Sequence, residues 1–174
     1  MHKETIKARL EAQYEAFVQM ISTLNEQEYV QAPEGKWNAG MQLEHLCKSV
    51  APVNLAFSLP AFLIRLVFGK ANRPSRSYEA LVEKYQLKLS AGGRASAPFV
   101  PEESRFSERD KWSIKLQKLI KKLSTRVEGF SEEQLDSLIL PHPLLGKLTL
   151  REMLFFTIYH AQHHQKSVLG MIEK

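Results

Sequence analysis

Three of the six histidines lie close together near the end of the chain, at positions 160, 163 and 164. If this segment is an α-helix, with about 100° of rotation per residue, the side chains of His160 and His164 lie about 40° apart and can reach one metal ion. Zinc proteases use the same spacing, but no glutamate follows the first histidine here, so the general base of their motif is absent. The pair therefore indicates either a metal site or a helical histidine pair without a metal.

Two protein ligands rarely make a tight metal site, so a third should come from another helix. His45 is the best candidate. Its neighbours at helical spacing, Met41, Ser49 and Pro52, are small or apolar. Periodicity alone does not show whether that face of the helix is buried. An ordinary surface histidine is therefore the alternative interpretation of His45.

The remaining histidines and the single cysteine are weaker candidates. His163 should point about 60° away from the first histidine of the pair, which makes it a neighbour of the site or an exposed residue. His2, near the start, and His142, between two prolines, are expected to be solvated. Cys47 lies about 200° around its helix from His45, too far to share an ion, so we expect a small buried residue.

The helices that carry these residues are predicted by apolar side chains that recur at steps of three or four. The predicted long helices cover about residues 6–24, 38–57, 107–127 and 149–169. No segment shows the alternation that is typical of a β-strand. Helices of this length bury their apolar stripes best against one another. We therefore expect a single all-α domain over residues 1–174, a four-helix bundle.

Capping residues and prolines mark the expected helix ends. Asn38 is a good N-cap because its side-chain oxygen can accept a free N–H of the first turn. The segments Ser131–Gln134 and Thr149–Glu152 are capping boxes, and the first of them should open a short helix. Pro52 should kink or interrupt the second long helix. Pro60 should open a further helical segment.

Residues 69–106 are expected to form a long crossover connection. Glycines and prolines punctuate this stretch, and only a short helix from about Tyr78 to Leu89 fits a helical pattern. A connection of this length would permit the two helices that it joins to run parallel. Loops this long in compact domains are usually functional or disordered, but no motif here indicates a role.

Charge and hydropathy narrow the class of protein. The formal charge is +5 and the pI is near 9.3. The basic residues are spread along the chain, apart from a cluster at Arg65, Lys70, Arg73 and Arg76. No nucleic-acid-binding motif is present, so we expect no nucleic-acid partner.

The most apolar stretch, residues 50–68, is too interrupted to span a membrane and would equally suit a core or a homodimer interface. A lone cysteine and the absence of an apolar leader favour the cytoplasm.

Two segments resemble the signatures of the DinB-like (YfiT-type) superfamily. In residues 36–46, a tryptophan precedes His45 by eight residues and a leucine follows it. Residues 150–165 resemble the final helix of the family, and the likeness extends over nearly the whole chain in helix order and length. The resemblance implies a four-helix bundle that binds one divalent metal through His45, His160 and His164.

Three imidazoles leave at least one coordination position open, as in catalytic metal sites. Imidazole suits several metals, and we expect zinc or nickel, with manganese or iron as the alternatives. Family members with known activity are thiol S-transferases or related thiol-dependent enzymes, and others are described only as metal-dependent hydrolases. The resemblance therefore implies a metal that activates a low-molecular-weight thiol for attack on an electrophilic small molecule. No side chain is assigned a catalytic role, because the reacting group would be a metal-bound thiol or water.

The basic cluster formed by Arg65, Lys70, Arg73 and Arg76 is expected at the mouth of the site, where it would attract the carboxylates of the thiol. Two other functions stay open. The first is a metal-dependent hydrolase that uses metal-bound hydroxide, although no glutamate stands at a motif position to act as its general base. The second is a non-catalytic metal-binding or interaction module.

Overall fold

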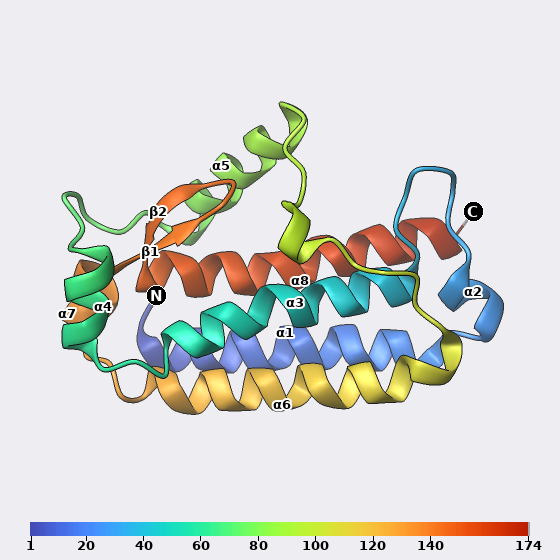
Figure 1. Ribbon diagram of the computed structural model, residues 1–174, viewed down its shortest axis with the longest axis horizontal. Coiled ribbons are helices and arrows are strands. Elements are labelled where there is room, and N and C mark those ends of the chain that lie inside the picture. The colour runs from blue at the N-terminus through green and yellow to red at the C-terminus, as the bar shows by residue number, and fades with distance from the viewer. Residues whose placement is uncertain (174) are drawn as a thin grey trace.

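The computed structural model describes residues 1–173 and places four long helices side by side in a bundle (Figure 1). These helices are α1 (Lys3–Thr23), α3 (Ala39–Ala56), α6 (Arg109–Val127) and α8 (Leu150–Ile172). In Figure 1, α3 and α6 run in one direction, and α1 and α8 run in the other. The predicted four-helix bundle is confirmed, and the two helices joined by the long connection are parallel.

Each long helix turns its predicted apolar stripe toward the bundle axis. Leu10, Tyr14 and Phe17 of α1 are at most 1% exposed, and Leu116 and Leu123 of α6 are fully buried. Burying a side chain of this kind contributes about 1.5–3 kcal/mol relative to leaving it in water. The stripes therefore supply most of the force that holds the four helices together.

Short elements cap the ends of the bundle and cover one side of it. They are α2 (Glu26–Val30), α4 (Ala61–Phe68), α5 (Tyr78–Ser90), α7 (Glu132–Ser137) and two single turns of 3-10 helix, η1 (Ala97–Phe99) and η2 (Phe106–Glu108). The segments α4 and α5 match the helices expected after Pro60 and within the long connection. The α2 helix was not predicted because its five residues are too few to show a periodic stripe.

Of the two outcomes expected at Pro52, a kink or an interruption, the interruption is wrong. The α3 helix continues through Pro52 to Ala56, and the proline is exposed on its outer side. Val50 and Val53 are buried on the inner side, so packing holds the helix together where local sequence would break it. The chain turns between α3 and α4, whose axes differ by 106°.

The expectation that the chain has no strand is also wrong. Residues Ile139–His142 (β1) and Gly146–Thr149 (β2) form an antiparallel hairpin in which His142 pairs with Gly146. A turn was expected here, and Gly146 adopts the positive φ of 76° that glycine favours. Four-residue strands with a proline are too short to show alternation, and the pairing depends on burial of Leu140 and Leu148 against the bundle.

The first turn of α8 is fixed by the predicted capping box. The Thr149 hydroxyl accepts a hydrogen bond from the Glu152 backbone N–H, and the Glu152 carboxylate accepts one from the Thr149 backbone N–H. Arg73 donates to both carboxylate oxygens of Glu152 at 2.6 and 2.8 Å. The backbone N–H of Arg76 donates to the same group at 2.9 Å. The fully buried carboxylate of Glu152 is therefore paired on every side.

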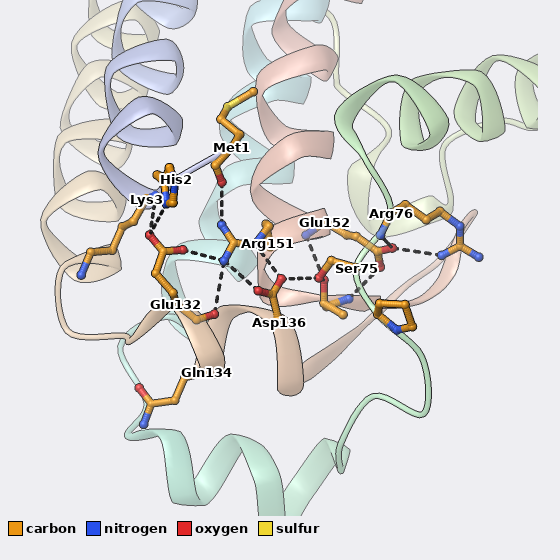
Figure 2. A network of polar contacts seen from close by, with 12 residues as sticks. Met1, His2, Lys3, Ser75, Arg76, Glu132, Gln134, Asp136, Arg151 and Glu152 are labelled. Carbon is orange, nitrogen blue, oxygen red and sulfur yellow. Dashed lines mark hydrogen bonds and ion pairs between the residues drawn. The ribbon is translucent and has the colours of Figure 1, made fainter.

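A second ion-pair group lies on the other side of the same turn (Figure 2). Arg151 donates to Asp136 at 2.6 and 2.9 Å and to Glu132 at 2.6 Å, which joins α8 to α7. Figure 2 shows Ser75 between the two groups, where its hydroxyl donates to Asp136 at 2.6 Å. The two groups together set the position and rotation of α8, the helix that carries two of the candidate ligands.

No single helix in the described residues is long and apolar enough to cross a membrane, although α3 and α4 taken together pass that test as a bent pair.

Candidate metal centre

The three predicted ligands meet in the interior of the bundle. His45 comes from α3, and His160 and His164 come from adjacent turns of α8. The Nε2 atom of His160 lies 3.1 Å from Nε2 of His45 and 3.1 Å from Nε2 of His164. One ligand atom from each of the three side chains lies within 4.8 Å of the others. The structure thus brings together residues 115 positions apart in the sequence.

This spacing suits a single metal ion. Bonds from zinc to a histidine nitrogen are about 2.0–2.1 Å long. One ion can therefore bond two nitrogens that lie 3.1 Å apart, because that separation is less than twice the bond length. All three nitrogens are of the same kind, and all face the same point between α3 and α8.

Hydrogen bonds on the outer side of two rings fix which nitrogen carries the proton. The Nδ1 atom of His45 lies 2.7 Å from the carbonyl oxygen of Phe99. The Nδ1 atom of His164 lies 2.9 Å from Oε1 of Gln42, whose amide nitrogen donates to the Trp37 carbonyl and so turns the oxygen toward the ring. Both acceptors require a proton on Nδ1, which leaves a lone pair on Nε2 of each neutral ring.

Two lone pairs therefore point toward His160. A single N–H on Nε2 of His160 can be directed at one of them but not at both. A cation between the three nitrogens would use all three lone pairs at once. Hydrogen bonds to Nδ1 commonly orient metal-bound histidines in this way. The donor set therefore fits a metal ion better than it fits a histidine pair without one.

Burial keeps the three imidazoles neutral. His45, His160 and His164 are 5%, 4% and 6% exposed. Desolvation lowers the pKa of His45 below its usual value, and it lowers the pKa of His160 and His164 much further, with a smaller contribution from the neighbouring histidines. All three are thus uncharged near pH 7, which is the form that binds a metal.

Aromatic rings surround the cluster. The ring of Trp37 lies 4.8 Å from that of His45, and the ring of Phe156 stacks on His160 at 4.8 Å. Trp37 therefore packs against a candidate ligand. The Ser49 hydroxyl lies 3.4 Å from Nε2 of His45 and is a polar group close to the point where the nitrogens converge.

Ser49 was expected as a helical neighbour of His45, but Gln42 and the carbonyl of Phe99 were not predicted. Gln42 lies three residues before His45, so helical spacing offered a signal for it. The carbonyl of Phe99 offered none, because it belongs to a long connection whose path is not encoded by periodicity. The orientation of the ligands was therefore less predictable than their identity.

His163 and Cys47 lie where the sequence indicated. The His163 ring is half-buried beside Tyr85 and His164 but is not part of the converging cluster. Cys47 is 1% exposed, its thiol donates to the Trp112 carbonyl, and burial raises its pKa to about 12. Neither side chain is a candidate ligand.

The expectation for His142 is wrong. Its ring packs against Phe156 with centroids 4.2 Å apart, and its Nδ1 accepts the backbone N–H groups of Leu144 and Leu145. Burial lowers its pKa to about 4. Flanking prolines suggested a solvated turn, but the unpredicted hairpin folds this turn back onto α8.

The expected basic mouth is also wrong for two of its four residues. Arg73 and Arg76 form ion pairs with the buried carboxylate of Glu152 at 2.6 and 3.1 Å. Glu152 precedes His160 by eight residues, about 12 Å along the helix. These arginines therefore stabilise the start of α8 and do not face the histidines. Arg65, in α4, and Lys70, two residues after its end, are exposed.

Comparison with known proteins identifies the family. The profile of the DinB superfamily matches residues 9–168. No curated protein and no solved structure matches the chain. The matched segment includes the three converging histidines and most of each long helix. The chain belongs to the DinB superfamily.

Proposed function

We propose that this chain holds one divalent transition metal ion, zinc or nickel first, on His45, His160 and His164, and that it transfers a low-molecular-weight thiol to an electrophilic small molecule. The observation that carries the proposal is the convergence of three Nε2 atoms. In His45 and His164 the hydrogen bond from Nδ1 to Phe99 or Gln42 leaves Nε2 unprotonated, with its lone pair free. Three protein ligands leave a coordination position for a substrate. A divalent ion in such a site lowers the pKa of a thiol or a water near neutral pH.

The residues of the chain orient the ligands and limit water. Phe99 and Gln42 set the rings of His45 and His164, and the aromatic rings of Trp37 and Phe156 cover two sides of the cluster. A site shielded from water strengthens the interaction between an anionic sulfur and its surroundings. The Ser49 hydroxyl is positioned to donate a hydrogen bond to an anionic group at the convergence point.

Metal-dependent hydrolysis is the second candidate, and one observation counts against it. Within residues 1–173, the cluster of side chains suited to a metal consists of three histidines and contains no carboxylate. Hydrolases that activate a metal-bound water commonly pair it with a general base such as glutamate. Thiol transfer has no such need, because the thiol itself is the nucleophile. A non-catalytic metal-binding or interaction module is the third candidate.

The proposal also concerns partners and location. We propose that the protein acts in the cytoplasm on small molecules, a thiol and an electrophile, and that neither nucleic acid nor a membrane is its partner. A homodimer is the assembly that we propose to test first, because Phe62 and Leu66 of α4 are 68% and 78% exposed. Apolar side chains this exposed are often covered in an assembly.

Metal content is the first test. The untagged protein, His160→Ala and His163→Ala would each be incubated with zinc, nickel or manganese, desalted and analysed for bound metal. We expect about one equivalent in the native protein and in His163→Ala, and a large loss in His160→Ala. Of these two substituted residues, His160 belongs to the cluster and His163 does not. A native protein without metal, or His160→Ala with as much as the native protein, would contradict the metal site.

The reaction is tested next with the metal-loaded protein. Loss of free thiol would be followed in mixtures of a small thiol and an electrophile, with and without the protein. Turnover that requires both the thiol and His160 supports the transferase. Product formed without thiol supports the hydrolase, and no turnover across a broad panel supports the non-catalytic module.

A further inference from the structure

One segment of the long connection lies against the candidate metal centre. We call residues 94–102 the strap. It follows the end of α5, includes η1 and reaches α3 near the middle of the bundle (Figure 1). Pro101 is the one buried residue of the strap, whereas the three histidines are at most 6% exposed. A segment with so few buried groups opens locally at low cost in free energy.

The strap is tied to α3 by side chains from a single stretch of that helix. His45 donates to the Phe99 carbonyl at 2.7 Å, and Lys48 donates to the Val100 carbonyl at 3.0 Å. The backbone N–H of Glu102 donates to Glu44 at 3.2 Å. One of these three contacts is made by His45, a candidate metal ligand. The other two are made by Glu44 and Lys48, which lie before and after His45 in α3.

Glu44 and Lys48 also bind each other. Their carboxylate and ammonium groups lie 2.7 Å apart, one helical turn from each other, and the Glu44 side chain is 6% exposed. A carboxylate this buried is stable only because it is paired and hydrogen-bonded. The pair therefore presents one donor and one acceptor to the strap in a fixed arrangement, with His45 next to Glu44 in the sequence.

We propose that Glu44 and Lys48 are positioning residues that hold the strap closed, and that through the Phe99 carbonyl they couple strap closure to metal retention by His45. This inference rests on the proposed metal site. Closure keeps the proton of His45 on Nδ1 and its lone pair on Nε2, which is the tautomer that binds a metal. A metal on Nε2 in turn favours the Nδ1 proton and the bond to Phe99, so each state stabilises the other.

The experiment measures both sides of this coupling in the full-length protein. Zinc release to a chromogenic chelator would be timed in the native protein, Lys48→Met, Glu44→Gln and the double variant. Trypsin cleavage after Arg94, an exposed residue of the strap, would be timed with and without zinc. Lys111→Met is the matched control, because Lys111 is a 70% exposed lysine on α6, outside the site. Lys48→Arg, which keeps a charged donor, is the rescue variant.

We expect zinc to slow cleavage after Arg94 in the native protein. In Lys48→Met and Glu44→Gln, zinc should leave about threefold to tenfold faster, somewhat less than the loss seen when a direct partner of a ligand is removed. Zinc should also protect Arg94 less in these variants. The double variant should release zinc little faster than either single variant, because both residues act through one strap. Lys111→Met should match the native protein, and Lys48→Arg should recover much of the retention.

Failure of the inference differs from failure of the metal site. The coupling is refuted, and the metal site stands, if the native protein binds zinc but Lys48→Met and Glu44→Gln release it at the native rate. The same holds if zinc does not change cleavage after Arg94. If the native protein binds no zinc, nickel or manganese, the metal site itself is wrong and the coupling falls with it.

Discussion

Replacement of Glu152 by glutamine tests how the start of α8 is held. Burial alone would raise the pKa of the Glu152 carboxyl, but hydrogen bonds from Arg73 and from the backbone N–H groups of Arg76 and Thr149 lower it to about 2. Glutamine at this position of a capping box can still accept the Thr149 backbone N–H. Glu152→Gln therefore removes the charge and leaves most of the cap.

The magnitude follows from the change in pKa between the unfolded and folded states. A fall from the ordinary value of 4.5 to about 2 corresponds to about 3 kcal/mol of stability at pH 7, at 1.36 kcal/mol per unit. The folded pKa is the lower one, so this stability is present above pH 4.5 and is lost as the pH falls toward 2. About 2 kcal/mol of it should be gone by pH 3, because the carboxyl of the unfolded chain is then largely protonated whereas the native carboxylate stays mostly ionised.

The assay is urea unfolding followed by circular dichroism at pH 7, 5, 4 and 3. We expect Glu152→Gln to be less stable than the native protein by about 3 kcal/mol at pH 7 and by about 1 kcal/mol at pH 3. Glu11→Gln, an exposed carboxylate on α1, is the control and should change stability by less than about 0.5 kcal/mol. A difference for Glu152→Gln that is the same at every pH would refute the assigned role of its charge.

Three further predictions concern the metal site and the core. Gln42→Leu should weaken zinc binding about tenfold in a chelator competition, because His164 loses its Nδ1 acceptor, whereas Gln42→Glu should keep most of the affinity. Gly40→Ala should cost about 1–3 kcal/mol in urea unfolding, because the new Cβ would lie 2.5 Å from the Tyr29 ring. The metal-free protein should lose stability as the pH falls below about 6.5, since the buried histidines have lowered pKa values, and saturating zinc should raise the thermal midpoint at pH 7.

The long helices could be predicted because the sequence of each one shows which of its faces is buried. An apolar residue every three or four positions indicates which face is inside without any knowledge of the partner helix. Asn38, Ser131 and Thr149 mark helix starts by local chemistry, and all three act as N-caps in the structure. What failed was decided by contacts between distant residues. The continuation of α3 through Pro52 and the hairpin at 139–149 both depend on packing that no local pattern records.

The candidate site, like the fold, could be predicted where local sequence decides and not where distant contacts decide. The spacing of His160 and His164 predicts a shared face, and the resemblance to the family supplied His45. The cluster of basic residues suggested a mouth only because they are close in sequence, whereas Arg73 and Arg76 pair with a glutamate that lies 79 and 76 residues away. Proximity in sequence indicates a shared location, but it does not tell whether a charge faces solvent or a buried partner.

The two polar systems of α8 should therefore be separable by experiment. The ion pairs of Glu152 and Arg151 act on the first turn of the helix, and the metal would act on residues two turns later. Substitutions at the first turn should lower the free energy of unfolding and leave zinc affinity of the folded protein nearly unchanged, because His160 and His164 keep their spacing on an intact helix. Substitution of Gln42 should weaken zinc binding and leave the free energy of unfolding nearly unchanged. If Glu152→Gln weakened zinc binding at a urea concentration and pH where the protein is fully folded, α8 would have to shift as a rigid body when its first turn is released, and the position of the ligands would depend on that anchor.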